Sequence, residues 1–380
     1  MEAERLVRLL AERGIDFFTG VPDSLLSGLC NYLMETVGIQ PGRHIIAHNE
    51  GGCVALAAGH YLATGKVPCV YMQNSGIGNA VNPAASLIHP KVYGIPVLFV
   101  IGWRGEPGVH DEPQHLYQGE ATLTMLDSID VAQFVVSKDT TEEEIRIAMD
   151  GFNGLFQEGK SAALVIRKGG IAGPDGKYAN GYHLVREQAI EKIIEAAGDG
   201  VLVSTTGKIS RELFEIRVRR GESHGQDFLT VGSMGHSVMI ALGIAQSKPG
   251  KAVWCIDGDG AMLMHTGALA TVGSQRPENL VHIVLNNAAH ESVGGAPTVA
   301  KSVDMPAAAK ALGYREAVSV TDEGELAIAL KRCANLKGPV FVEVKVSLGS
   351  RDDLGRPTVS PAENKEALMR FLKCPKGGPA

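Results

Sequence analysis

Two stretches decide the fold of this chain: Ala252-Val253-Trp254-Cys255-Ile256-Asp257-Gly258-Asp259-Gly260 and Val281-His282-Ile283-Val284-Leu285-Asn286-Asn287. Each is an apolar run of strand length that ends in a polar turn, and the residues between them have helical spacing. Strand, helix and strand in this order form a βαβ unit, whose strands run parallel. The carboxylate of Asp259 and the amide of Asn287 should therefore emerge side by side at the carboxyl edge of a sheet.

These two side chains suit a divalent cation. Mg²⁺ prefers oxygen ligands, takes few of them from protein carboxylates, and completes its octahedron with water and phosphate oxygens. Gly258 and Gly260 flank Asp259 and let the backbone approach a ligand closely. The spacing and the strand context favour a magnesium site for a diphosphate over the alternative, a solvated aspartate beside an Asn-Asn turn.

The composition is that of a globular α/β protein. The chain has 380 residues, 44% hydrophobic and 21% charged, which is enough for two or three domains with full cores. A formal net charge of −6 gives no electrostatic reason to expect nucleic acid or a membrane surface as partner. No apolar run reaches the roughly 18 residues of a membrane span, and the N-terminus does not resemble a signal peptide. The six cysteines form no CxxC pair, so we expect buried, reduced thiols in a cytoplasmic protein.

Strand-like and helix-like segments alternate along both halves of the chain. The run 171–177 is rich in Gly and Pro and has neither period, which favours a linker. We predict an α/β protein of two doubly wound parallel-sheet domains with no middle domain: residues 1–170, a linker over 171–185, and residues 186–380. Strands are expected at 15–19, 44–48, 67–73, 97–102, 134–137, 162–167, 201–205, 228–231, 252–256, 281–286 and 340–346, and late helices at 306–312 and 323–336.

Several segments resemble the thiamine-diphosphate-dependent decarboxylases. The Gly258-Asp259-Gly260 and Asn286-Asn287 pair is similar to that family's magnesium-diphosphate signature. Within the family, the chain resembles the phosphonopyruvate and sulfopyruvate decarboxylases over nearly its whole length. The resemblance implies a pyrimidine-binding first domain and a diphosphate-binding second domain, with thiamine diphosphate and Mg²⁺ as cofactors. The segments that carry it are Gly20-Val21-Pro22-Asp23-Ser24-Leu25-Leu26, 48–59, 108–113 and 286–295.

The resemblance also assigns roles toward the cofactor. Glu50 matches the glutamate that hydrogen-bonds the aminopyrimidine, whereas on general grounds it would be a carboxylate favoured by a helix N-terminus. Met234 matches the apolar wedge that bends the cofactor, although a core methionine in a tight turn is the alternative. Asp259, Asn287 and the Ala289 carbonyl are the expected metal ligands. The remaining cofactor-binding residues are Thr206, Gly207, Gly232, Gly258, Gly260, Ala261 and Ser292.

A further set of residues is expected to face the substrate. Asp23 resembles the family's active-site aspartate, and Asn79 lies in a glycine loop that faces cofactor and substrate in these enzymes. His110 and His115 resemble a paired-histidine loop, although they are five residues apart and a polar surface loop is the alternative. The expected catalytic residues are Glu50, Asp23, His110, His115 and His290, and the expected substrate contacts are Asn79, Arg104, Lys208 and Arg211.

The implied activity is decarboxylation of 3-phosphonopyruvate to phosphonoacetaldehyde and CO₂ in phosphonate biosynthesis. Val293 stands where pyruvate decarboxylase carries a catalytic glutamate, which leaves the proton donor open between the nearby Glu291 and a histidine. The resemblance implies a homo-oligomer, at least a dimer, with active sites at the subunit interface.

Three other functions remain open at this stage. The first is a sulfopyruvate decarboxylase or another 2-keto-acid decarboxylase or carboligase. The second is a nicotinamide oxidoreductase, against which Val81 stands where the dinucleotide fingerprint requires its third glycine. The third is a catalytically silent binding subunit, against which Glu50 and Asp259 both occur on one chain.

Overall fold

The structure, a computed structural model, describes residues 1–291 and 294–373. These residues divide into two compact units. Unit 1 comprises residues 1–178 and 294–296, and unit 2 comprises residues 179–291 and 297–373. Each unit contains its own six-stranded sheet in which all neighbouring strands run parallel. The predicted fold class, two doubly wound α/β domains, is confirmed.

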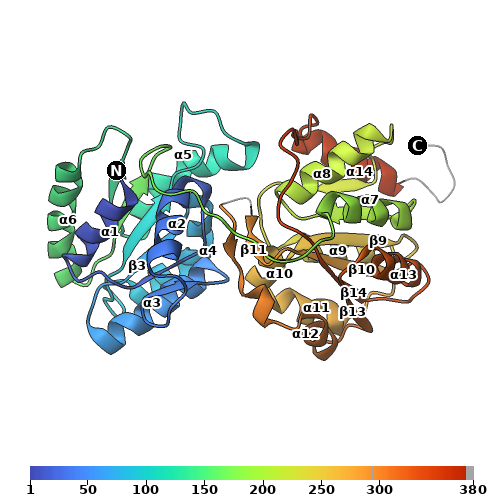
Figure 1. Ribbon diagram of the computed structural model, residues 1–380, viewed down its shortest axis with the longest axis horizontal. Helices are drawn as coiled ribbons and strands as arrows, with labels where there is room; N and C mark the ends of the chain where they lie inside the picture. Colours follow the sequence, from blue (N-terminus) through green and yellow to red (C-terminus); the bar gives the residue numbers. More distant parts are fainter. Residues whose placement is uncertain (292–293, 374–380) are drawn as a thin grey trace. The chain divides into compact units, whose positions relative to one another are not determined.

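Unit 1 alternates helices and strands, and its sheet has the order β2-β1-β3-β4-β6-β5. Its strands are β1 (Phe18–Gly20), β2 (His44–Ile46), β3 (Cys69–Gln73), β4 (Leu98–Gly102), β5 (Ala132–Val136) and β6 (Ala162–Ile166). Its helices are α1 (Ala3–Ala11), η1 (Ser24–Leu26), α2 (Ser27–Thr36), α3 (Glu50–Thr64), η2 (Asn74–Gly76), α4 (Ile77–Pro83), η3 (Ala84–Ile88), α5 (Pro113–Ser128) and α6 (Glu142–Gln157). The apolar faces of α1, α2 and α6 cover one face of this sheet (Figure 1).

Unit 2 follows the same alternation, and its sheet has the order β13-β14-β10-β9-β7-β8. Its strands are β7 (Val201–Ser204), β8 (Asp227–Leu229), β9 (Val253–Gly258), β10 (Leu280–Asn286), β13 (Glu316–Val320) and β14 (Val340–Lys345). Its helices are α7 (Arg186–Ala197), α8 (Lys208–Arg219), α9 (Ser237–Ser247), α10 (Asp259–Met264), α11 (Gly267–Gln275), η5 (Val299–Ser302), α12 (Met305–Ala311), α13 (Glu323–Cys333) and α14 (Pro361–Lys373). Two short strands, β11 (Ala289–His290) and β12 (Ala296–Pro297), lie between β10 and η5 in the sequence.

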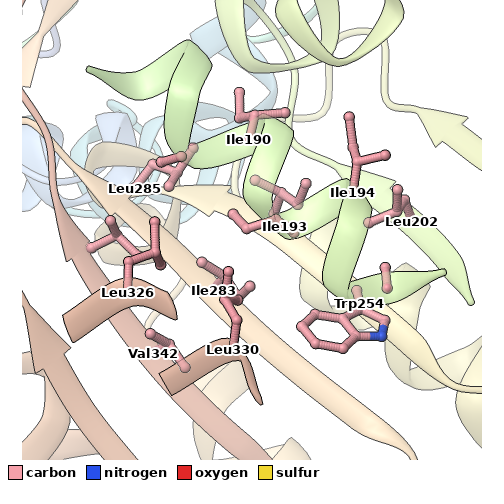
Figure 2. Packing of buried hydrophobic residues seen from close by; sticks show 14 of the residues in the cluster. Ile190, Ile193, Ile194, Leu202, Trp254, Ile283, Leu285, Leu326, Leu330 and Val342 are labelled. Atoms are coloured by element: carbon pink, nitrogen blue, oxygen red, sulfur yellow. The ribbon is translucent and has the colours of Figure 1, made fainter. Parts of the chain in front are cut away.

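The core of unit 2 shows why the central strands read as continuous apolar runs. Alternate residues of β9 and β10 point to opposite faces, and helices cover both faces. On one face Ile190 and Ile194 of α7 and Leu330 of α13 pack onto Trp254 and Ile283 (Figure 2). The other face is covered by α9, α11 and α12. A strand buried on both faces holds its carboxyl end in a fixed place, which positions the polar turns that follow.

Two elements differ from the sequence-based expectation. No strand was expected between the two late helices, but β13 lies there and pairs with β14. Glu316-Ala317-Val318-Ser319-Val320 contains two polar residues without strict alternation, and only Val320 is fully buried, so its pattern is weaker than the buried runs. The polar loop expected over His110 to His115 ends early, because Pro113 begins α5 and places His115 in its first turn.

The region predicted as a linker has no regular helix or strand, and the boundary between the units falls inside it, after Tyr178. Residues 294–296 belong to unit 1, although the sequence predicted them in the second domain, residues 186–380. Five cysteines, all except Cys374, lie in the described part of the chain and are buried free thiols as expected. Among the described residues, no helix has the length and apolarity that crossing a membrane requires.

Candidate active site

Glu50 lies at the carboxyl end of β2, as the first residue of α3. Asn49 caps the helix by accepting a hydrogen bond from the Gly51 N–H at 2.8 Å. The Glu50 side chain is 5% exposed, and its Oε2 accepts a hydrogen bond from Asn79 Nδ2 at 2.8 Å. A Cβ added to Gly76 would lie 2.6 Å from Glu50 Oε1, so the glycine makes room for the carboxylate. The structure thus brings two predicted residues, Glu50 and Asn79, together.

Asp23 follows β1 at the same edge of the sheet and is fully buried. Its carboxylate accepts hydrogen bonds from Gln73 Nε2 at 2.6 Å and from the Leu25 N–H at 3.0 Å. Gly102, the last residue of β4, lies so close to Asp23 that a side chain there would collide with the carboxylate. Burial raises the pKa of Asp23 above its ordinary value, although these hydrogen bonds oppose the rise. Gln73 is a partner that the sequence analysis did not identify.

Arg104 follows β4, which is separated from β1 by β3 in the sheet. Its guanidinium donates to Asp111 from Nε at 2.8 Å and from Nη2 at 2.5 Å, and from Nη1 to the Ser24 hydroxyl at 2.9 Å. Burial alone would raise the pKa of Asp111, but Arg104 and the Gly105 N–H hold it below its ordinary value. Arg104, which was predicted to bind the anionic substrate, therefore already forms an ion pair with Asp111.

The two histidines of the predicted pair have different environments. His110 is exposed in the loop before α5, whereas His115 is buried in the helix. Burial, together with the charge of Arg104, lowers the pKa of His115 to about 4. At pH 7 its imidazole is therefore neutral, and it carries no imidazolium proton to donate as an acid.

Asp259 follows β9 directly, as the first residue of α10. The side chain is 3% exposed, and its Oδ2 accepts a hydrogen bond from the Thr298 hydroxyl at 2.6 Å. Burial raises the pKa of Asp259 to about 6, although Thr298 and the backbone N–H groups of Gly260 and Asn287 act in the opposite direction. A buried carboxylate of this kind is stabilised when a cation binds it. The sequence carried no signal for Thr298.

Asn287 follows β10, the strand next to β9. Its Oδ1 accepts a hydrogen bond from the Ala289 N–H at 3.1 Å, and its Nδ2 donates to Glu291 Oε2 at 2.6 Å. Glu291 also accepts from Lys208 Nζ at 2.8 Å and from Arg186 Nη1 at 2.5 Å. Burial alone would raise the pKa of Glu291, but the two cations hold it below its ordinary value. Arg186, missed from sequence, joins this group from the start of α7.

Two further predicted residues, Met234 and His290, lie beside Gly260. A Cβ added there would lie 3.3 Å from Met234 Cε and 3.7 Å from His290 Nδ1, so these side chains line the space beside the glycine. Burial lowers the pKa of His290 to about 4. At the ends of β7 and β8, the Thr206 hydroxyl accepts a hydrogen bond from the Gly232 N–H at 3.1 Å.

The other predicted residues of unit 2 lie around these turns. Gly258 ends β9, Ala261 lies in α10, and Ala289 begins β11. Gly207 has φ of 95° and open space where a side chain would be. Arg211 donates to the backbone carbonyls of Leu354 and Gly355, which occupy its guanidinium. Ser292 lies outside the described residues.

The residues of unit 2 fit a magnesium diphosphate. Asp259 and Asn287 supply a buried carboxylate and an amide oxygen from adjacent strands, and Ala289 supplies a carbonyl two residues later. Glycines at 207, 258 and 260 leave the backbone accessible. Mg²⁺ in a diphosphate site binds a few protein oxygens, and phosphate oxygens complete its coordination. Asp259, Asn287 and the Ala289 carbonyl are a set of this kind.

Comparison with known families agrees with this arrangement. Residues 2–128 match the family described as "Thiamine pyrophosphate enzyme, N-terminal TPP binding domain". Residues 205–344 match "Thiamine pyrophosphate enzyme, C-terminal TPP binding domain". The first match includes Glu50 and the second includes both Asp259 and Asn287.

Similarity to curated proteins extends over the full length. The chain is 36% identical to the phosphonopyruvate decarboxylase of Streptomyces viridochromogenes, over 100% of this chain and 96% of the relative. The chain belongs to the thiamine-diphosphate-dependent decarboxylases. The phosphonopyruvate decarboxylase of Streptomyces hygroscopicus is 32% identical, over 99% of this chain and 95% of the relative. The sulfopyruvate decarboxylase of Methanosarcina acetivorans is 25% identical, over 97% and 96%.

This decarboxylase is thus a carboxy-lyase of the phosphonopyruvate and sulfopyruvate type, with thiamine diphosphate as its cofactor. The family resemblance deduced from sequence motifs is confirmed. The roles of the individual site residues stay predictions.

Proposed function

We propose that this enzyme decarboxylates 3-phosphonopyruvate to phosphonoacetaldehyde and CO₂, with thiamine diphosphate and Mg²⁺, in phosphonate biosynthesis. The observation that carries the proposal is the pairing of Asp259 and Asn287 at adjacent strand ends in a chain similar throughout to phosphonopyruvate decarboxylases. The higher identity to the two Streptomyces enzymes than to the sulfopyruvate enzyme supports the choice of substrate.

In this proposal the two units bind different parts of the cofactor. Unit 2 holds the diphosphate through Mg²⁺ on Asp259, Asn287 and the Ala289 carbonyl, and unit 1 presents Glu50 to the aminopyrimidine. Bound thiamine diphosphate supplies a nucleophilic carbon and the electron sink for the pair left when CO₂ departs. The family resemblance implies a homodimer or larger oligomer, with active sites at the subunit interface and a cytoplasmic location.

The residues of this chain then have separate tasks in proton transfer. Glu50 is held by Asn79 and exchanges a proton with the aminopyrimidine. The product requires one proton at the carbon that loses CO₂. Asp23 is suited to hold that proton because burial raises its pKa, whereas His115 and His290, each with a pKa of about 4, are neutral at pH 7.

A substrate panel tests the function. Phosphonopyruvate, sulfopyruvate and pyruvate are supplied at equal concentration with thiamine diphosphate and Mg²⁺, and CO₂ and the aldehyde are measured. We expect kcat/KM to be highest for phosphonopyruvate, with phosphonoacetaldehyde as product. Preferential turnover of sulfopyruvate, or formation of a carboligation product, would replace the substrate assignment and leave the cofactor assignment standing.

A further inference from the structure

Glu291 fixes the orientation of the Asn287 amide. Its Oε2 accepts from Asn287 Nδ2 at 2.6 Å, while the Ala289 N–H donates to Asn287 Oδ1 at 3.1 Å. An amide offers an acceptor at one end and two donors at the other, and a rotation by half a turn exchanges them. Both ends of this amide therefore have a partner that only the observed orientation satisfies.

The Glu291 carboxylate is itself fixed by two cations. Arg186 Nη1 donates to it at 2.5 Å and Lys208 Nζ at 2.8 Å. Arg186 is 4% exposed and is in turn held by Glu212, which accepts from its Nε and its Nη2 at 2.7 Å each. Bidentate arginine-carboxylate pairs define geometry closely. The group thus connects the start of α7 and the start of α8 to the turn after β10.

We propose that Glu291 is a positioning residue for the metal site. By accepting from Asn287 Nδ2 it keeps Oδ1 available, and Oδ1 has a second lone pair beyond the one that the Ala289 N–H uses. If the amide turned, it would present an NH₂ group, which cannot bind a cation. This inference rests on the proposed role of Asn287 as a metal ligand.

The same contacts give Lys208 a role different from substrate binding. Its ammonium group pairs with Glu291 and so belongs to the support of Asn287. Residues that orient a metal ligand typically change metal affinity by about 10- to 100-fold when replaced. We expect an effect of this size from Glu291, without any contact between Glu291 and the cation.

The test measures the affinity for Mg²⁺ by titrating thiamine diphosphate calorimetrically at a series of Mg²⁺ concentrations. Glu291→Leu removes the acceptor and should weaken Mg²⁺ binding by about 10- to 100-fold. Glu291→Gln retains an acceptor oxygen for Asn287 Nδ2 and should recover part of the loss. In an Asn287→Ala background, Glu291→Leu should add little, because its effect acts through Asn287.

Asp227→Asn is the matched control, because Asp227 is a buried carboxylate of the same unit that Arg217 holds in a bidentate pair, outside the group around Glu291. Mg²⁺ binding by this variant should remain near that of the wild type. An equal loss in Asp227→Asn, a full additional loss in the double variant, or a Glu291→Gln affinity no better than that of Glu291→Leu would overturn the inference. If Glu291→Leu fails to fold by circular dichroism, Glu291→Gln is compared with Asp227→Asn, and an Mg²⁺ affinity of Glu291→Gln equal to that of Asp227→Asn overturns the inference.

The proposed function and this inference fail in different ways. If the wild type binds thiamine diphosphate with no dependence on Mg²⁺, the metal assignment fails and the positioning role fails with it. If thiamine diphosphate binding by the wild type does depend on Mg²⁺, but Glu291→Leu binds Mg²⁺ as tightly as the wild type, only the positioning role is overturned.

Discussion

Read from one edge, the sheet of unit 1 has the order β2-β1-β3-β4-β6-β5, and the sheet of unit 2 has the order β8-β7-β9-β10-β14-β13. Numbered within each unit, these two orders are identical. The strand ends therefore correspond in pairs: β1, β2, β3 and β4 of unit 1 match β7, β8, β9 and β10 of unit 2. In both units the predicted site residues lie in the turns after these strands. The strand order is the same and the residues at those turns differ, so the comparison separates what the shared topology supplies from what the turns supply.

The turns of unit 1 hold acids beside neutral amides. Glu50 accepts a hydrogen bond from Asn79, and Asp23 accepts one from Gln73. At the corresponding ends in unit 2, Met234 stands in place of Glu50, and Thr206 in place of Asp23. A neutral amide lets a carboxylate gain or lose a proton without breaking an ion pair. Unit 1 is therefore equipped for proton exchange.

The turns of unit 2 hold the proposed metal-binding residues beside charged side chains. Asp259 corresponds in position to the Asn74 turn of unit 1, and Asn287 to Arg104. Arg186 and Lys208 lie one contact away, through Glu291. Ion pairs on Glu291 hold the Asn287 amide in one orientation, which suits a metal that needs near-ideal octahedral geometry. In the proposed function, unit 2 therefore binds an anion through a cation.

Among the variants that test this difference between the two units, we expect the largest effect on cofactor binding from a change at Asp259. Asp259→Ala removes the only carboxylate of the proposed metal set, so Mg²⁺-dependent binding of thiamine diphosphate should be lost. The loss should exceed the roughly 10- to 100-fold typical of a residue that only orients a ligand. Calorimetric titration with and without Mg²⁺ measures it, and the exposed Asp199→Ala in the same unit is the control. A cofactor-saturated, active Asp259→Ala enzyme would contradict the assignment.

A smaller and different effect is expected at Glu50. Glu50→Gln keeps the hydrogen-bonding shape but cannot exchange a proton, so exchange of the cofactor C2 proton should slow by about 10²- to 10⁴-fold. Cofactor affinity should remain close to that of the wild type, because the diphosphate is held by unit 2. Exchange into deuterated water is followed by proton NMR, with calorimetry for the affinity. Wild-type exchange in this variant would show that unit 1 does not supply the acid.

The smallest effect concerns stability at low pH. The pKa of His115 is about 4 in the folded protein against an ordinary value of 6.5, so folding favours its neutral form. Its contribution to stability is complete above pH 6.5 and is lost as the pH falls toward 4. Between pH 7 and pH 5, the cofactor-free His115→Gln variant should therefore lose about 2 kcal/mol less stability than the cofactor-free wild type.

Thermal unfolding at the two pH values measures this difference. The exposed His183→Gln serves as control and should follow the wild type. If His115→Gln loses as much stability as the wild type on acidification, His115 is not held neutral by burial. In that case it could donate a proton near pH 7, and the preference for Asp23 as donor would lose its support.

The sequence by itself determined the fold class, the family and the order of the functional halves. Buried parallel strands are nearly continuous apolar runs, and the glycine-flanked Asp259 and the Asn287 turn follow them directly, so local pattern was sufficient. The edge strand β13 was not predicted because two of its five residues are polar and four are only partly buried. A partly buried strand has a weaker hydrophobic pattern in the sequence.

Only the tertiary structure decided which groups support the predicted residues. Thr298 reaches Asp259 from 39 positions away, and Arg186 reaches Glu291 across 105 positions. Such contacts depend on how helices and turns pack, and a single sequence has no period or spacing that records them. The state of the charges was decided in the same way. Burial sets the pKa values of Asp23, His115 and Asp259, because removing water disfavours the charged form.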